Sequence, residues 1–313
     1  MKHNNRLQRG YCTNCKKRTT HKDGVGHYLC KLCSMALEDK LSPDETQKLR
    51  LLENLSVNEV RAIVNHKKIN NGKCYDYPIT GHIKIGVISD SHIGHNMFDE
   101  GLFKFSGEVF RKEQVMGVYH AGDILEGMSG RDGNVYEMNQ VGFSNQIKYA
   151  EGLIQKHYRG LKLYCINGNH DLWFKLKNNA GVNVAEELQR RLPEQIVYLG
   201  DMEADVRFGP NCVMKLFHGN DGTAYASSYK LQKLIESLEG GSKPQIILSG
   251  HYHKALYMFN RNVHGLECGT LCGQSGFMRG KKIPAHKGFY ILEFDNTKRG
   301  IANFGIKFFP AYD

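Results

Sequence analysis

The chain has 313 residues, of which 41% are hydrophobic and 24% are charged, as is ordinary for a folded globular protein. No stretch approaches 18 consecutive apolar residues, and the first ten residues lack an apolar core, so we expect neither a membrane span nor a signal peptide. The cysteine count of nine is odd, and we therefore expect a cytoplasmic protein without a disulfide scaffold.

The net charge of +10 is concentrated near the N-terminus. Residues 1–80 contain 15 Lys/Arg against 8 Asp/Glu, so they carry more than half of it. A basic N-terminal arm on a nearly neutral body favours contact with a polyanion, and nucleic acid is the first candidate. A basic surface that only aids solubility is the alternative.

Residues 1–38 contain two C-x2-C pairs separated by 14 residues. The four cysteines are Cys12, Cys15, Cys30 and Cys33. Two such pairs complete the tetrahedral thiolate shell of a structural Zn²⁺ ion. A segment this short cannot bury enough apolar surface to fold alone, so the metal would supply the missing stability. A redox dithiol and thiols that occur there by chance are the alternatives.

Residues 39–80 are expected to form a short helical hairpin followed by a linker. Ser42 and Pro43 suit the N-cap and first position of one helix, and Ser56 with Glu59 has the spacing of a capping box for a second. Such a hairpin resembles a small nucleic-acid-binding element. A helical spacer that packs on the main domain is the alternative. The linker is expected over residues 70–80.

Residues 81–313 alternate between strand-like and helix-like stretches, which predicts an α/β domain. Helices are expected near 99–112 and 145–158. The strand-like runs are 83–89, 115–121, 161–167, 213–218, 245–249 and 289–294.

Each of the first five of these strands runs directly into ligand-type side chains. The motifs, in chain order, are Asp90-x-His92, Gly122-Asp123, Gly168-Asn169-His170-Asp171, His218-Gly219 and Gly250-His251-Tyr252-His253. In α/β sheets, ligands bind beyond the carboxyl ends of the strands, so we expect these motifs to converge in space. Unrelated capped turns would not explain five such motifs in this order.

Over residues 82–295 this motif set resembles the calcineurin-like metallophosphoesterase superfamily, and the stretches SDSHIG and HAGDILEG are most similar to its DNA-repair nuclease branch. The resemblance implies a four-layer α/β sandwich, in which helices flank two mixed β-sheets and two divalent metal ions lie at the strand ends. The zinc-binding segment and the helical linker are additions to this pattern. The layout is similar to that of phage or prokaryotic enzymes, which implies the host cytoplasm if a phage encodes the chain.

The resemblance also implies the metal ligands. They are Asp90, His92 and His253 for the first ion, Asp123 as the bridge, and Asn169, His218 and His251 for the second ion. This donor set suits Mn²⁺, Fe or Zn²⁺ better than Ca²⁺. Mn²⁺ is the first expectation, with Fe, Zn²⁺ or Mg²⁺ as alternatives.

The implied reaction is phosphoester hydrolysis by a water that both ions activate. His170 is assigned to the leaving group or a phosphoryl oxygen, with Asp171 orienting its ring. A supporting role for His170 without direct chemistry is the alternative.

One departure from the family pattern concerns the substrate. Many phosphomonoesterases continue the second motif as G-D-x-x-D-R, whereas this chain has Glu126 and Gly127 at the last two positions. The missing arginine clamp shifts the expectation toward diesters. Arg131 and His95 are candidate substrate contacts, with a solvated arginine and a surface histidine as the alternatives.

The sequence therefore predicts a two-metal phosphodiesterase, a nuclease acting on DNA ahead of RNA. One alternative is a phosphatase or small-nucleotide phosphodiesterase whose basic N-terminus binds a protein partner. Another is a non-catalytic nucleic-acid-binding accessory subunit. The filled ligand positions argue against the last.

Overall fold

The computed structural model describes residues 10–11, 18–19, 74–176, 181–209, 211–222, 224–239 and 243–312. The chain divides into two units, Met1–Asn70 and Asn71–Asp313. In the first unit, β1 (Gly10–Tyr11) and β2 (Arg18–Thr19) pair in antiparallel fashion. The predicted zinc ligands Cys12, Cys15, Cys30 and Cys33, and the predicted helical hairpin, lie outside the described residues.

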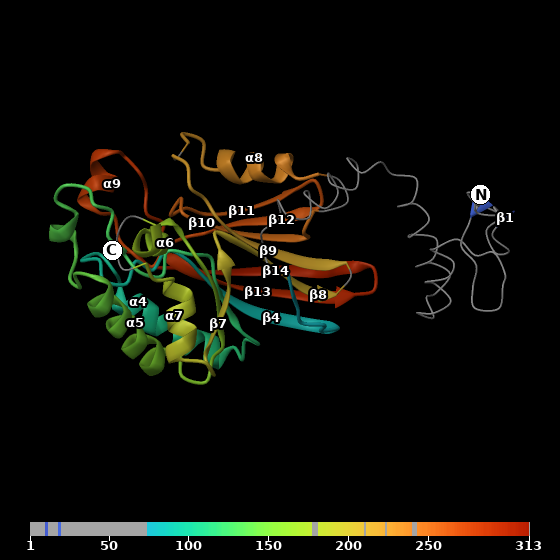
Figure 1. Cartoon of the computed structure of the whole chain (residues 1–313), viewed down its shortest axis with the longest axis horizontal. Coiled ribbons are helices and arrows are strands. Elements are labelled where there is room, and N and C mark those ends of the chain that lie inside the picture. Colours follow the sequence, from blue (N-terminus) through green and yellow to red (C-terminus); the bar gives the residue numbers. More distant parts are fainter. Residues whose placement is uncertain are drawn as a thin grey trace, which may run out of the picture. The chain divides into compact units, whose positions relative to one another are not determined.

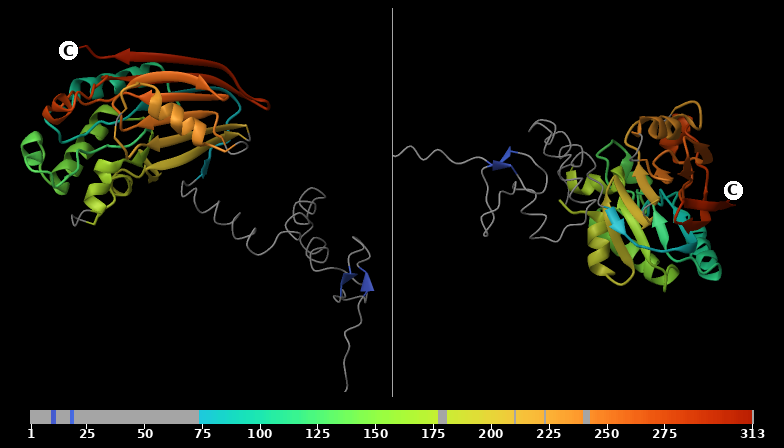
Figure 2. Two further views of the ribbon diagram at one scale, coloured as in Figure 1. Left: turned by 90° about the horizontal axis from the view of Figure 1, so that it is seen from above. Right: turned by 90° about the vertical axis from the view of Figure 1, so that its right-hand side faces the viewer.

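The second unit is built on two six-stranded mixed sheets (Figures 1 and 2). The first sheet consists, in spatial order, of β14 (Gly300–Pro310), β13 (Gly288–Thr297), β4 (Gly81–Ile88), β5 (Val118–His120), β6 (Leu163–Asn167) and β7 (Ile196–Asp201). The second consists of β11 (Ala255–Asn260), β12 (Val263–Cys268), β10 (Ile246–Gly250), β9 (Cys212–His218), β8 (Glu203–Gly209) and β3 (Cys74–Asp76). The strands β4, β5, β6 and β7 are parallel, as are β9, β10 and β12.

The main core lies between the two sheets. Along β4, Ile83, Ile85 and Val87 alternate with other residues and pack among side chains of the second sheet, including Leu248. Ile88 belongs to a different cluster, on the helical side of the first sheet. A central strand covered on both faces reads as a nearly continuous apolar run, which is why this stretch is recognisable in the sequence. Each such buried side chain contributes roughly 1.5–3 kcal/mol.

Helices cover the outer faces of both sheets. The helices α4 (Glu100–Lys112), α5 (Phe143–His157) and α7 (Val184–Arg191) pack against the first sheet, and α8 (Tyr229–Ser237) packs against the second (Figure 1). Asp99 caps α4 by accepting the Leu102 N–H at 2.8 Å. None of the described helices has the length and apolar character needed to span a membrane. The predicted four-layer sandwich is confirmed.

Residues 74–76, which the sequence pattern assigns to the linker, form β3 at the edge of the second sheet. The Tyr75 hydroxyl donates to the carbonyl oxygen of Tyr198 at 3.0 Å, and Tyr77 and Ile79 pack against the core between the sheets. For these residues the linker prediction is wrong. A strand of three residues is too short to give a readable period of two.

Candidate active site

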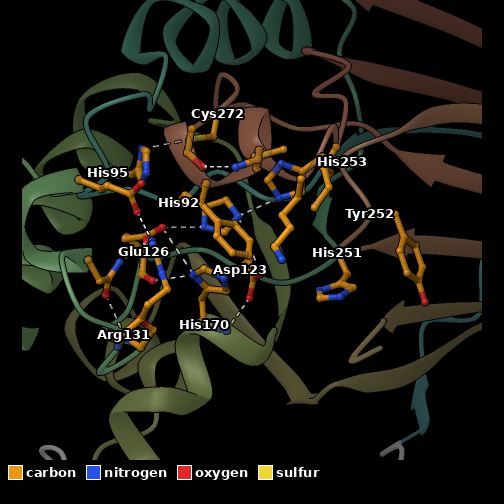
Figure 3. Close-up of a pocket in the computed structure, with 18 of the residues that line it drawn as sticks. His92, His95, Asp123, Glu126, Arg131, His170, His251, Tyr252, His253 and Cys272 are labelled. Atoms are coloured by element: carbon orange, nitrogen blue, oxygen red, sulfur yellow. Dashed lines mark hydrogen bonds and ion pairs between the residues drawn. The ribbon is translucent and has the colours of Figure 1, made fainter. Parts of the chain in front are cut away.

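The five polar motifs converge at one edge of the sandwich, beyond the carboxyl ends of β4, β5, β6, β9 and β10. They surround a cavity of about 650 Å³ (Figure 3). Six of the motif residues line it directly: His92, Asp123, His170, His251, Tyr252 and His253. The predicted convergence is therefore observed.

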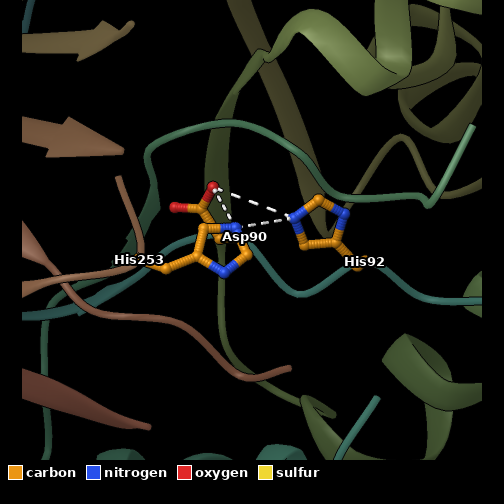
Figure 4. Close-up of side chains that lie close together, drawn as sticks. All are labelled: Asp90, His92 and His253. Carbon is orange, nitrogen blue, oxygen red and sulfur yellow. Dashed lines mark hydrogen bonds and ion pairs between the residues drawn. The ribbon is translucent and has the colours of Figure 1, made fainter. Parts of the chain in front are cut away.

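One group of donor atoms consists of Asp90, His92 and His253 (Figure 4). The Nε2 atoms of the two histidines are 3.1 Å apart. The Asp90 Oδ1 atom lies 3.4 Å from His253 Nε2 and 3.9 Å from His92 Nε2. Three potential ligand atoms thus face one point, as predicted for the first ion.

A second group lies beside it. His218 Nε2 is 3.2 Å from Asp123 Oδ2 and 3.1 Å from Asn169 Oδ1, and His251 Nδ1 is 2.9 Å from the same amide oxygen. Asp123 Oδ2 is also 3.8 Å from His92 Nε2 in the first group. The Asp123 carboxylate therefore lies between the two groups, where a bridging ligand is expected.

The outer ring nitrogens of three histidines face fixed oxygen acceptors. The pairs are His92 Nδ1 with Glu126 Oε2 at 3.0 Å, His218 Nδ1 with the Ala121 carbonyl at 2.8 Å, and His251 Nε2 with the Asp221 carbonyl at 2.9 Å. In a neutral ring whose outer nitrogen donates, the inner nitrogen carries a lone pair, and here it points at carboxylate and amide oxygens. Facing lone pairs repel unless a proton or a metal ion lies between them. The donor set and its outer hydrogen bonds therefore fit divalent metal ions.

Neighbouring histidines lower the pKa of the two buried carboxyl groups of the cluster, which favours their ionised form. Burial alone would raise the pKa of Asp123, but the neighbouring His218 and His170 hold it well below its usual range. Burial likewise opposes ionisation of Asp90, and the facing His253 outweighs it, so the pKa of Asp90 is also lowered. Ionised carboxylates are the form that binds metal ions.

Sharp backbone turns aim the predicted ligands at the cavity. Five of them have left-handed backbone conformations that favour glycine: Asp90, His92, Asp123, His251 and His253, with φ between 47° and 86°. Such conformations cost of order 1–3 kcal/mol each and persist only where the surroundings enforce them. The ligands thus lie in the turns that follow the strands. Asp90 and His92 belong to the turn after β4, which ends at Ile88.

Gly168 allows β6 to approach Asp123 closely. A Cβ atom at position 168 would lie 2.1 Å from Asp123 Oδ1 and 2.4 Å from its backbone nitrogen. The same oxygen accepts the His170 N–H at 2.8 Å. Only glycine fits this contact between the second and third motifs.

His170 lines the cavity, and Glu126 holds its ring. His170 Nδ1 donates to the Glu126 carbonyl oxygen at 2.7 Å and lies 3.5 Å from Oε2 of the same residue. Burial opposes protonation of the ring, but Asp123 and Glu126 outweigh it and raise the pKa of His170 to about 9. Trp173 packs against the ring with 3.8 Å between the centroids. This arrangement leaves His170 Nε2 to act on a substrate.

The prediction that Asp171 orients the His170 ring is wrong. The Asp171 carboxylate accepts three backbone N–H groups, from Ile124 at 3.0 Å, Leu125 at 2.9 Å and Gly168 at 2.9 Å. It therefore ties the Asp123 loop to the Gly168 turn. Backbone donors have no sequence signature, so the pattern could not reveal this role. Glu126 orients both His92 and His170. In the sequence, only its position three residues after Asp123 draws attention to it.

We expect Asp171→Asn to destabilise the protein without removing any ligand. An amide group can accept from fewer of the three N–H donors, and its own NH₂ would face one of them. The free energy of unfolding should fall by about 2–4 kcal/mol, measured by urea denaturation. Asp295→Asn, at a carboxylate that bonds to exposed His82, is the matched control. Equal stability of the two variants would contradict this role for Asp171.

The two candidate substrate contacts both line the cavity. His95 is only 5% exposed, so it is not a surface histidine. Its Nδ1 accepts the Met97 N–H at 2.8 Å, which places the proton of the neutral ring on Nε2. Arg131 forms an ion pair with Glu137, and its guanidinium lies 4.9 Å from the centre of the Phe277 ring. Substrate contact by His95 and Arg131 remains a prediction.

Comparison with known proteins places these residues within one family. Residues 83–297 match the model of the calcineurin-like phosphoesterase superfamily domain. No curated protein sequence matches the chain.

Three solved structures illustrate the similarity in fold. An archaeal phosphodiesterase is 19% identical, with 72% of this chain and 100% of that chain covered and a TM-score of 0.42. Vacuolar Protein Sorting 29 from Cryptosporidium parvum is 15% identical, with 74% and 100% covered and a TM-score of 0.39. A putative 5'-nucleotidase from Staphylococcus aureus is 12% identical, with 74% and 55% covered and a TM-score of 0.39. Similarities this weak add no argument to the family match.

Proposed function

The chain belongs to the calcineurin-like phosphoesterase superfamily, a family of metal-dependent phosphoesterases, and from this premise we propose that it hydrolyses phosphodiester bonds in nucleic acid, DNA ahead of RNA. The preference for diesters and the identity of the polymer are separate parts of this proposal. The first rests on the cavity and the second on the N-terminal segment.

The observation that carries the diester preference is the packing of Gly127, which stands where many phosphomonoesterases have an arginine. A Cβ atom there would lie 2.2 Å from the His170 carbonyl oxygen and 3.1 Å from the Trp173 ring, so the position has no room for a side chain.

The missing guanidinium acts against a phosphate monoester. A monoester carries close to two negative charges at neutral pH and a diester carries one. Without a guanidinium at position 127, the cavity wall favours the less charged group.

The residues of the cavity have distinct tasks in this reaction. Asp90, His92 and His253 would hold one divalent ion, and Asn169, His218 and His251 the other, with Asp123 between them. Bound there, the ions would lower the pKa of the attacking water and neutralise charge on the phosphoryl oxygens.

His170 would serve the leaving group. Its Nε2 donates a proton to the leaving oxygen or a hydrogen bond to a phosphoryl oxygen, while the Glu126 carbonyl keeps the ring oriented. His95 Nε2–H would be a second, neutral donor to the substrate.

Recruitment of the polymer is assigned to the N-terminal segment. Its support is the charge of residues 1–80 and the zinc-ligand spacing of Cys12, Cys15, Cys30 and Cys33. DNA is proposed ahead of RNA because the motif stretches are most similar to the DNA-repair branch.

We expect the variant Cys12→Ser to bind single-stranded DNA at least about tenfold more weakly than the wild type at low salt, because the zinc shell that shapes the basic segment would be lost. Fluorescence anisotropy and zinc content would be measured together. A chain that begins at Asn71 is the companion variant, because it keeps β3 and removes the whole first unit. Hydrolysis of a small diester is the control for an intact cavity. DNA binding unchanged in both variants would refute the recruitment proposal.

A further inference from the structure

We propose that the part of the cavity formed by the α9 region is a binding site for one unpaired nucleobase, with the Phe277 ring as its stacking surface. The inference rests on the proposed nuclease function. It specifies that the enzyme acts where the base beside the scissile phosphate is unpaired. It assigns a specificity role to a segment outside all five motifs.

The cavity extends from the histidine cluster to α9 (Gly276–Gly280) and the residues that follow it. Phe277, Met278, Lys281 and Ile283 all line it. Phe277 is 44% exposed. An aromatic ring that faces an open cavity beside a phosphoester site offers a flat surface to a substrate.

Two contacts fix the helix and the ring. The Ser275 hydroxyl caps α9 by accepting the Met278 N–H at 3.2 Å, which fixes the short helix. The Arg131 guanidinium lies over the Phe277 ring, 4.9 Å from its centre, and Glu137 holds the arginine by an ion pair. A fixed ring costs little entropy when a ligand stacks on it.

The chemistry of this wall matches a nucleobase. Aromatic rings and guanidinium planes are the surfaces on which proteins stack unpaired bases. The guanidinium is already over the Phe277 ring, so the base would take the remaining exposed surface of the ring. Lys281 adds a positive charge to the same wall.

The cavity is large enough for one nucleotide. A volume of about 650 Å³ lies within the range of pockets that enclose small ligands, roughly 300–1,000 Å³. The scissile phosphate would lie at the histidine cluster and the neighbouring base on Phe277. A base within a duplex has both faces stacked and cannot enter, so the site selects single strands and frayed ends.

The test compares oligothymidylate with its abasic counterpart, which has the same backbone without bases. Wild type should have the higher kcat/KM on the strand that carries bases. Phe277→Ala should lower kcat/KM on that strand by about 5- to 150-fold and lower it far less on the abasic strand. Phe277→Trp should retain the preference for bases, because it keeps an aromatic surface.

The control is Phe259→Ala, which removes another exposed ring, 57% exposed on β11, that does not line the cavity. It should behave as wild type on both strands. Equal losses on the two strands in Phe277→Ala, or no base preference in the wild type, would overturn the inference. Absence of hydrolysis of either strand by the wild type would instead reject the proposed nuclease function.

Discussion

Asp123→Ala is expected to abolish phosphodiester hydrolysis, with kcat/KM lowered by more than about 10³-fold. This loss exceeds the loss that follows removal of one hydrogen-bond donor to a transition state. The Asp123 carboxylate lies 3.2 Å from His218 Nε2 and 3.8 Å from His92 Nε2, so it is the ligand that both proposed metal sites share. Its loss would weaken both sites together. Steady-state kinetics with added Mn²⁺ and calorimetric titration of the metal would measure the two effects.

Asp123→Asn separates loss of charge from loss of structure. An amide oxygen can still accept the His170 N–H that Asp123 Oδ1 now accepts at 2.8 Å, and the volume is almost unchanged. We expect this variant to fold normally and to be nearly as inactive as Asp123→Ala. If Asp123→Asn bound both ions with wild-type affinity and hydrolysed diesters at the wild-type rate, the bridging role would be incorrect.

His170→Ala is expected to lower kcat by about 10²- to 10⁴-fold on a nucleic-acid strand, the usual contribution of a positioned proton donor. The physical reason is that an alkoxide leaves poorly without a proton, and the ring lies in the cavity with Nδ1 already bonded to the Glu126 carbonyl. A nitrophenolate needs no such proton. The loss on a nitrophenyl diester should therefore be much smaller.

The ratio between these two losses distinguishes a chemical role from a structural one. If His170 only supported the fold of the cavity, both substrates would suffer equally in His170→Ala. His264→Ala, at a half-buried histidine of β12 outside the cavity, is the matched control and should alter neither rate. A uniform loss on both substrates would show that His170 does not act on the leaving group.

Much of the fold could be predicted because its determinants are local in the sequence. The run from Ile83 to Ile88 is apolar except for Lys84, and one acid and two imidazoles, Asp90, His92 and His95, follow just beyond its carboxyl end. Strand ends of this kind meet at one edge of a sheet, so the order of motifs predicted the cluster of Asp90, His92, Asp123 and the distant His253. The structure confirms the sandwich and brings these residues together.

The supporting contacts could not be predicted, because packing decides them. Asp171 and Glu126 are both acids near predicted ligands, and the sequence does not reveal which of them faces backbone N–H groups and which faces His170. The structure gives the first role to Asp171 and the second to Glu126. The position of Phe277 in the cavity could not be predicted either, because the ring contacts Arg131, which is far away in the chain.

The most direct test is hydrolysis by the metal-stripped full-length chain, to which Mn²⁺ is restored, on four substrates: DNA, RNA, a bis-aryl phosphate and an aryl monophosphate. We predict no hydrolysis before the metal is added, hydrolysis of diesters afterwards, and a clear preference for diesters over the monoester. Metal analysis of the protein before stripping should find one tightly held zinc and a weaker pair of ions. Absence of hydrolysis of every phosphodiester, with both ions bound at the histidine cluster, would contradict the account.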